Sequence, residues 1–370
     1  MEGSDIIFNI GIFLHVKDLL SLKLVQQSFN HTLSSSFFWQ SKLKSDFGIS
    51  TKLNNQSWLQ RYQLALSMGN IVISDLCDSS PLNFDIGEEI NVVDDPEINT
   101  FRILPYKAIQ AIFVRPCLYY ITDDHDLYMV GQPGYNAPIY KTPQLLDTNV
   151  TQLTGNPYTF LYLKQGNIHI HHDNNIIKLT DQGNIKQFSY SCPYLSYVED
   201  DGICRRVELY WDEDNNVEID YITHTHEDII NVIETASFTL LLNQSGRIQL
   251  DGILLDQEIK DYIEHNYITN IAGFIILINN QNRATCLSIS QKDEDEEDDD
   301  LYKKIIIKLS NQFEHIPDVI CGCESLLPST SHSVLTKKGE VYVNKNDTVI
   351  KLNIKAKSMC QSPTNMLLII

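Results

Sequence analysis

Apolar residues recur at helical spacing through the first part of the chain, up to about residue 68. Short helices are predicted over 6–14, 18–30, 36–46 and 57–66. The fourth begins at Ser57, and Gln60 three positions later completes the pattern of a capping box. Short helices joined by short loops make a small unit with a limited core.

The second of these segments, KDLLSLKLVQQSFN from Lys17, carries apolar residues on more than one face. Leu22, Val25 and Phe29 form one stripe, whereas Leu20 and Leu24 form another. A surface helix normally buries a single stripe, so the second stripe needs a covering surface of its own.

After residue 68 the pattern changes to short runs of alternating side chains separated by polar turns, which is typical of hairpins. The turns centre near residues 125, 166, 215, 246, 281 and 339, about 43 residues apart on average. This spacing, with four strands per unit, predicts a β-propeller. The segment 70–370 has room for seven blades. The end of the segment, Asn365–Ile370, is expected to supply a strand that closes the ring.

Charge and composition limit the classes of partner. The 370 residues carry a net charge of −20, which argues against nucleic acid and against an anionic membrane surface, since both require clustered cations. The apolar run 6–16 is too short to cross a bilayer, and the start of the chain lacks the basic residues of a signal peptide. The eight cysteines are scattered, as expected of unpaired thiols in an intracellular protein, cytoplasmic or nuclear.

Histidine and cysteine pairs are weak candidates for chemistry. His169 and His171 share one face of a predicted strand, but no third ligand for a metal is placed by the sequence, so exposed histidines are favoured. The same holds for the pair at 224 and 226, and Cys321 and Cys323 are expected to be a buried structural pair.

No motif of an enzyme is present: the phosphate-binding loop, the nucleophile elbow, HExxH and GxGxxG after a strand are all missing. The acidic run 293–300 is predicted to be a solvated loop. We therefore expect no cofactor, no metal and no catalytic residues.

The propeller units resemble the repeat of the regulator of chromosome condensation (RCC1). The segments 126–134 (DLYMVGQPG) and 335–343 (LTKKGEVYV) match it best, each with a strand before a dipeptide that ends in Gly. Hydrophobic lead-ins of the repeat are found at 149–155, 230–233, 268–273 and 316–322. The resemblance implies a propeller that binds proteins, and in some members a nucleotide-exchange factor for a small GTPase.

Residues 5–43 resemble the F-box. The pattern I-x-x-x-L corresponds to Ile10–Leu14, K-D-L-L-x-L-x-x-V corresponds to Lys17–Val25, and the later aromatic positions correspond to Phe29 and Trp39. The Leu-Pro that opens the family motif is missing. The resemblance implies a three-helix unit that docks a Skp-type adaptor, which links it to a cullin scaffold and a ubiquitin-conjugating enzyme.

The resemblance gives the second stripe a partner, since one stripe would hold the helices together and the other would be covered in the complex. The residues assigned to the adaptor are Ile6, Ile10, Leu14, Leu19, Leu20 and Leu22. The residues assigned to the F-box core are Val25, Phe29 and Trp39. The alternative is a helical cap packed on the propeller, with both stripes buried within the chain.

The predicted fold class is thus a multidomain α plus all-β protein, an N-terminal three-helix F-box followed by a seven-bladed β-propeller. The predicted division is an F-box over 1–48, a linker helix over 49–69 and a propeller over 70–370 with an acidic insertion at 291–301. The leading hypothesis is a non-catalytic substrate receptor of a Skp–cullin–F-box ubiquitin ligase, whose propeller binds an unknown target. The alternatives are a decoy that titrates the adaptor and a guanine-nucleotide exchange factor.

Overall fold

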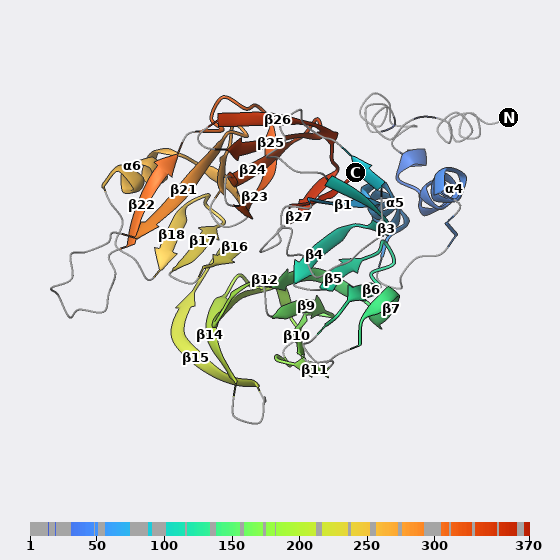
Figure 1. The fold of residues 1–370 in the computed structure, drawn as a ribbon, viewed down its shortest axis with the longest axis horizontal. Helices are drawn as coiled ribbons and strands as arrows, with labels where there is room; N and C mark the ends of the chain where they lie inside the picture. The colour runs from blue at the N-terminus through green and yellow to red at the C-terminus, as the bar shows by residue number, and fades with distance from the viewer. Residues whose placement is uncertain are drawn as a thin grey trace.

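Seven β-sheets stand side by side around a central axis in the part of the chain that the structure describes (Figure 1). The computed structural model describes residues 14, 19, 31–47, 49–50, 56–74, 88–90, 101–114, 117–133, 138–155, 159–172, 175–181, 183–211, 217–235, 238–251, 257–272, 276–291, 305–310, 312–327, 330–345, 348–360 and 366–370. The predicted seven-bladed propeller is confirmed.

Six blades follow one another along the chain, each an antiparallel meander numbered from the axis outward. Blade 1 contains β4 (Gln110–Val114), β5 (Cys117–Ile121), β6 (Leu127–Gly131) and β7 (Tyr140–Asp147). Blade 2 contains β8 (Val150–Gly155), β9 (Phe160–Lys164), β10 (Asn167–His172) and β11 (Asn175–Lys178). Blade 3 contains β12 (Ile185–Ser191), β13 (Tyr194–Glu199), β14 (Cys204–Trp211) and β15 (Val217–His226).

The next three blades include a shorter one. Blade 4 contains β16 (Ile229–Glu234), β17 (Thr239–Asn243) and β18 (Ile248–Asp251), followed by helix α6 (Gln257–His265). Blade 5 contains β19 (Ile268–Ala272), β20 (Ile276–Asn279), β21 (Ala284–Gln291) and β22 (Ile305–Ser310). Blade 6 contains β23 (Val319–Leu327), β24 (Thr330–Thr336), β25 (Glu340–Lys345) and β26 (Thr348–Lys355). Helix α6 was not predicted from the sequence.

Blade 7 closes the ring with strands from both ends of the propeller segment. Its order is β2 (Glu88–Ile90), β3 (Phe101–Ala108), β1 (Gly69–Ser74), β28 (Leu367–Ile369) and β27 (Ser358–Cys360). The pairing of β1 with β28 confirms the predicted closing strand. A side chain at Gly69 would place its Cβ 2.0 Å from the carbonyl oxygen of Ile370, so the closure requires glycine there.

Buried aliphatic and aromatic side chains fill the spaces between adjacent blades. One such cluster joins Leu161 and Ile168 of blade 2 to Phe188 and Leu195 of blade 3, all at most 1% exposed. The innermost strands of neighbouring blades contact each other all the way round, from β4 through β8, β12, β16, β19 and β23 to β27 and back to β4. The ring therefore has a continuous core and no open edge toward the axis.

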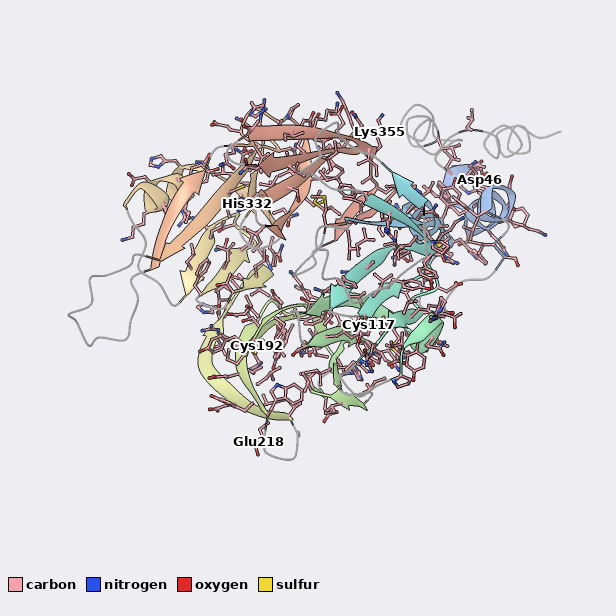
Figure 2. The ribbon with its side chains drawn as sticks, in the orientation of Figure 1. Asp46, Cys117, Cys192, Glu218, His332 and Lys355 are labelled. Atoms are coloured by element: carbon pink, nitrogen blue, oxygen red, sulfur yellow. The ribbon has the colours of Figure 1, made fainter. Side chains whose placement is uncertain are left out.

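Two described helices precede the propeller, α4 (Ser36–Phe47) and α5 (Trp58–Ser67). They lie beside β1 and β3 at one side of the ring (Figure 1), and Asp46 of α4 is labelled there in Figure 2. The predicted capping box of α5 is confirmed, since Ser57 Oγ accepts from Gln60 N at 3.1 Å and Gln60 Oε1 accepts from Ser57 N at 2.8 Å. A three-helix F-box is not confirmed, because most of residues 1–30 lie outside the described residues. No helix in the described ranges is long and apolar enough to span a membrane.

Candidate functional site: the channel, its turn face and the helical attachment

The turns between the second and third strands of each blade lie at one end of the propeller, which we call the turn face. In blades 1 to 6 one residue of the turn has positive φ, and its carbonyl oxygen accepts from an N–H at or just before the start of the next innermost strand. These residues are His125, Gly166, Gly202, Gly246, Asn282 and Gly339. In blades 1 and 5, His and Asn take the place of the Gly that the repeat pattern expects. Both residue types tolerate this conformation better than most.

The hairpin predicted around residue 215 is confirmed, but it joins β14 to β15 at the opposite end of blade 3 and is not the equivalent turn of the repeat. The equivalent turn is at 200–203, where the carbonyl oxygen of Gly202 accepts from Ile229 N at 2.9 Å. The error arose because β14 and β15 form a long hairpin with strong alternation, which masks the shorter Asp-Asp-Gly turn before it.

The innermost strands of blades 1 to 5 share the local pattern aliphatic–x–amide–hydrophobic. In blades 2 to 5 the amides are Gln152, Gln187, Asn231 and Asn270, and Gln110 has the same place in blade 1. In four of these strands the pairing shifts between the first aliphatic residue and the amide, which marks a β-bulge at x. Two of the quoted lead-ins, 149–155 and 268–273, contain this pattern, so the signal was present in the sequence, although the amides were not singled out.

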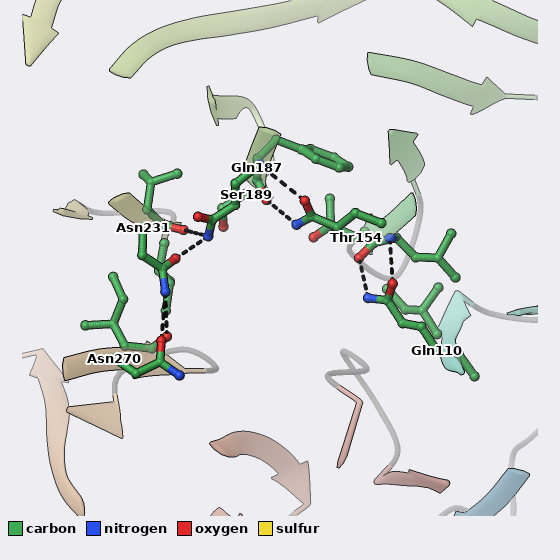
Figure 3. A pocket seen from close by; sticks show the side chains of 15 residues that line it. Gln110, Thr154, Gln187, Ser189, Asn231 and Asn270 are labelled. Atoms are coloured by element: carbon green, nitrogen blue, oxygen red, sulfur yellow. Dashed lines mark hydrogen bonds between the residues drawn. The ribbon is translucent and has the colours of Figure 1, made fainter. Parts of the chain in front are cut away.

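The amides join blades 1 to 5 in succession along the channel wall (Figure 3). Gln152 donates to Phe188 O at 2.8 Å and accepts from Phe188 N at 3.4 Å, so one side chain continues the strand pairing across the gap. Gln110 bonds Leu153 O and N in the same way at 3.3 and 3.2 Å. Asn231 donates to Ile271 O at 3.0 Å and accepts from Gln187. This ring satisfies backbone groups that would otherwise face the channel unpaired.

The channel holds a pocket of about 320 Å³, lined by these amides and by the backbone of blades 1 to 5. Thr154 and Ser189 add hydroxyl groups to the wall, and Ser189 Oγ accepts from Glu234 N at 2.9 Å. The lining is uncharged and largely engaged in bonds between blades. Its main role is therefore to hold the ring together.

A buried ionic cluster lies between blades 3 and 4. Glu234 is 1% exposed and accepts from Arg206 Nη2 at 2.9 Å, from Thr239 Oγ1 at 2.9 Å, and from Ser196. Burial raises the pKa of Glu234, and these donors oppose the rise. Arg206 also stacks on the ring of Tyr194, at 4.1 Å from the ring centroid. The carboxylate is enclosed by its own donors, which is the arrangement of a structural ion pair.

The helices form a small core of their own. Its buried members are Leu19, Leu33, Phe38, Trp39, Leu43, Tyr62 and Ala65. Trp39 Nε1 donates to Leu33 O at 2.7 Å, and the Tyr62 hydroxyl donates to Asp46. Leu14 packs partly buried against this cluster.

A buried arginine attaches the helices to the propeller. Arg61 of α5 is 2% exposed. Its Nη1 donates to Asp123 Oδ2 at 2.8 Å and to Asp123 O at 3.0 Å, and its Nη2 donates to Asp124 Oδ1 at 2.8 Å. Asp123 and Asp124 belong to the β5–β6 turn of blade 1, so α5 is anchored on the turn face. Lys357 Nζ adds a bond to Met68 O at 2.7 Å. No pattern in the sequence indicates this contact.

The described residues include only part of the predicted adaptor-binding set. Leu19 was expected to be left exposed for a partner, but it is 1% exposed within the helical core, so that assignment is corrected. The cause is that Leu33, Phe38 and Tyr62 converge on it from three segments. Leu14 is partly buried, and Trp39 is 3% exposed. The remaining predicted residues, Ile6, Ile10, Leu20, Leu22, Val25 and Phe29, lie outside the described residues.

The two histidines of β10 are not the exposed residues that were predicted. His171 is 5% exposed, and its Nδ1 lies 3.3 Å from the hydroxyl of Tyr119 in blade 1. His169 is stacked on Tyr162, with ring centroids 5.2 Å apart, and burial lowers its pKa. His171 packs against the rings of Tyr119 in blade 1 and Phe160 in blade 2. Their role is therefore packing and hydrogen bonding within the core.

The described residues contain no group of three or more His, Cys, Asp or Glu side chains that could hold a metal ion. Among the described residues, Cys117, Cys192, Cys204, Cys286 and Cys321 form no disulfide bond, and Cys321 is partly buried in β23. The side chain of Cys323, the side chain of His224 and the acidic run 293–300 lie outside the description.

Comparison with family models gives no match, and no curated protein sequence is significantly similar. Among solved structures, yeast RCC1 (Prp20) bound to Kap60 superposes with a TM-score of 0.54 at 8% identity, covering 82% of this chain and 90% of that one. Prp20p from Saccharomyces cerevisiae, studied for its binding to Gsp1p and histones, gives 0.53 at 9% identity, covering 81% and 91%. Human WBSCR16 gives 0.51 at 11% identity, covering 81% and 98%. At these identities the likeness concerns the fold, which is that of an RCC1-like β-propeller.

Proposed function

We propose that this chain is a non-catalytic protein-recognition subunit, whose propeller binds a protein partner and whose amino-terminal helices provide a second docking element. The observation that supports it best is the closed ring, in which amide side chains join blades 1 to 5 and turn carbonyls join blades 1 to 7 in succession. Such a scaffold holds its surface loops in fixed positions, which lowers the entropy lost when a partner binds.

The sequence resemblance favours a receptor role in a ubiquitin ligase. Residues 5–43 match the F-box pattern, and Arg61 fixes the helices to the turn face, so an adaptor on the helices would hold a constant geometry to a target on the propeller. The chemistry would be proximity alone, because the chain raises the local concentration of target lysines near the conjugating enzyme.

Co-elution and calorimetry with a purified Skp-type adaptor test this role. The wild-type chain is expected to form a one-to-one complex, and Ile10→Asp and Leu20→Asp are expected to abolish it. Ile176→Asp is the matched control, since Ile176 is an exposed apolar residue on the outermost strand of blade 2. Leu19 is unsuitable for this test because it belongs to the helical core. An adaptor that fails to bind the wild-type chain refutes the receptor role.

A decoy that titrates the adaptor would give the same binding result. The two are separated by reconstituting the ligase with a target captured by the propeller. Ubiquitination of that target rises for a receptor and falls for a decoy as the chain is added.

Exchange of guanine nucleotide on a small GTPase is the second candidate, and the fold comparisons favour it over the ligase role. The observation is the RCC1-like propeller, with TM-scores of 0.53 and 0.54 to Prp20p, whose binding to Gsp1p has been studied. The test is release of a fluorescent GDP analogue from a panel of small GTPases, with and without the full chain. A catalytic amount of chain that accelerates release from one GTPase supports the activity, and unchanged rates across the panel refute it for that panel.

A further inference from the structure

The β-bulges place one residue of each innermost strand outside the regular pairing, on the turn face next to the mouth of the channel. In blades 2 to 6 this bulge residue follows the first aliphatic residue, whose N–H is bound to the preceding turn. The bulge residues are Thr151, Lys186, Ile230, Thr269 and Ile320, and all of them are exposed.

Two of the five bulge residues are apolar. Ile230 in blade 4 is 40% exposed and Ile320 in blade 6 is 38% exposed, whereas the other three positions carry Thr or Lys. The bulge geometry does not require an apolar side chain, because polar residues serve equally well in the neighbouring blades. Tyr267, which immediately precedes the innermost strand of blade 5, is 51% exposed and packs beside Gly246. Three consecutive blades therefore present apolar surface at the same end of the channel.

Carboxylates surround Ile230. Glu227 and Asp228 lie just before it, and the Asp200-Asp201 turn of blade 3 lies alongside. The closeness of the two segments follows from the hydrogen bond between Gly202 O and Ile229 N, and from the 3.5 Å between a Cβ built at Gly202 and Asp228 Cα. All four carboxylate residues are exposed.

Exposed cations lie on the same face. Lys186 occupies the bulge of blade 3, Arg247 lies in the turn of blade 4 next to Gly246, and Lys337 and Lys338 lie in the turn of blade 6. On the blade 3 side of Ile230 the four carboxylates outnumber the single Lys186, so the field there favours a basic partner.

We propose that the mouth of the channel on the turn face, over blades 4 to 6, binds a polypeptide segment of a partner that carries an apolar anchor flanked by Lys or Arg. The anchor contacts Ile230, Tyr267 and Ile320, and the basic residues face the carboxylates at 200, 201, 227 and 228. The same negative charge disfavours nucleic acid as the occupant. The inference rests on the proposed function, because it assigns the face and the chemistry of the partner site.

The probe is a random peptide library displayed on phage and selected on the full-length chain. Enriched peptides are synthesised with a fluorophore, and their binding is measured by anisotropy at low and at high salt. The variants are Ile230→Ser with Ile320→Ser, Asp200→Asn with Asp201→Asn, and Ile176→Ser as the control of equal exposure on the outer strand of blade 2. A photoreactive phenylalanine analogue replacing Thr269, between the two isoleucines, gives an independent readout on a chain with both isoleucines intact.

The expected result is enrichment of peptides with an apolar residue between basic ones. The double serine variant should bind about tenfold more weakly. The double asparagine variant should lose about tenfold at low salt and less at high salt. Ile176→Ser should bind like the wild type, and the analogue at 269 should crosslink to the peptide.

Peptides without basic residues, binding unaffected by both double variants, or crosslinking from position 176 but not from 269 would overturn the inference. If an adaptor or GTPase still binds the chain in that case, the proposed function is retained and only the assignment of the binding face is refuted. Loss of both kinds of binding refutes the proposed function itself.

Discussion

The attachment of the helices through Arg61 gives a prediction that joins stability to geometry. Replacing Arg61 by Met keeps most of the volume of the side chain and removes the charge. It leaves Asp123, whose side chain is 8% exposed, without its ionic partner. Removing one member of a buried ion pair typically costs about 3–5 kcal/mol, because the remaining charge is poorly solvated. Asp124 contributes little, since its side chain is 56% exposed and solvent screens the interaction.

The loss should be local. Trp39, Tyr62 and their neighbours hold the helices together independently of Asp123, and the propeller is closed without them. A cost of about 3 kcal/mol raises the population of the undocked state, and hence the exchange of the amide hydrogens of α5, by more than about 100-fold. The strands of blades 2 to 5 should keep their protection.

Hydrogen exchange with mass spectrometry measures both regions in one experiment. Asp124→Ala is the control and should change the exchange of α5 by less than about tenfold. Replacing both members of the pair, Arg61→Met with Asp123→Leu, should restore much of the protection, because no unpaired charge is then buried. If Arg61→Met leaves the exchange of α5 at the wild-type rate, the attachment is held by other contacts and the reasoning fails.

Three further predictions follow from single side chains. Gly166 has φ +71°, and an added Cβ would lie 2.3 Å from Gly183 O, so Gly166→Ala should lower the free energy of unfolding by several kcal/mol. Gly183→Ala, at a position with the same φ and open space for a Cβ, should cost only about 1 kcal/mol. Thermal or denaturant unfolding measures both. Burial lowers the pKa of His332 to about 4, so the unfolded chain binds the proton more readily below pH 6.5. The free energy of unfolding should therefore fall as the pH drops from about 6.5 to 4, by about 3 kcal/mol at most. His332→Gln should flatten that part of the pH profile, and an unchanged slope would contradict the prediction. Glu234→Gln weakens the bonds to Arg206 and Ser196 and should destabilise the propeller by about 2–3 kcal/mol in urea titrations, a prediction that an unchanged midpoint would refute.

The propeller could be predicted because its repeat consists of patterns between residues that are close in the sequence. Alternating strands and turn residues are signals within a few positions, and ring closure follows from an apolar strand at 367–369. The turn in blade 3 was misplaced because two hairpins compete within the same 30 or so residues, and only the bond from Ile229 to Gly202 decides between them.

The candidate surfaces were harder to predict because they depend on contacts between distant segments. Arg61 and Asp123 are 62 positions apart, and neither has a distinctive neighbourhood in the sequence. The alternation of the strand predicts His171 to be exposed, and only its contact with Tyr119 of the preceding blade shows that it is buried. Leu19 was assigned to a partner from helical periodicity, which identifies an apolar face but not what covers it.

The pairing of β1 with β28 has a consequence for how the protein is made. Strand β1 leaves the ribosome early and remains without a hydrogen-bonding neighbour on the β28 side until almost 300 more residues have been synthesised. During that interval an apolar edge, Ile71 to Ile73, is open to other chains, so nascent protein should depend on chaperones far more than the finished ring does.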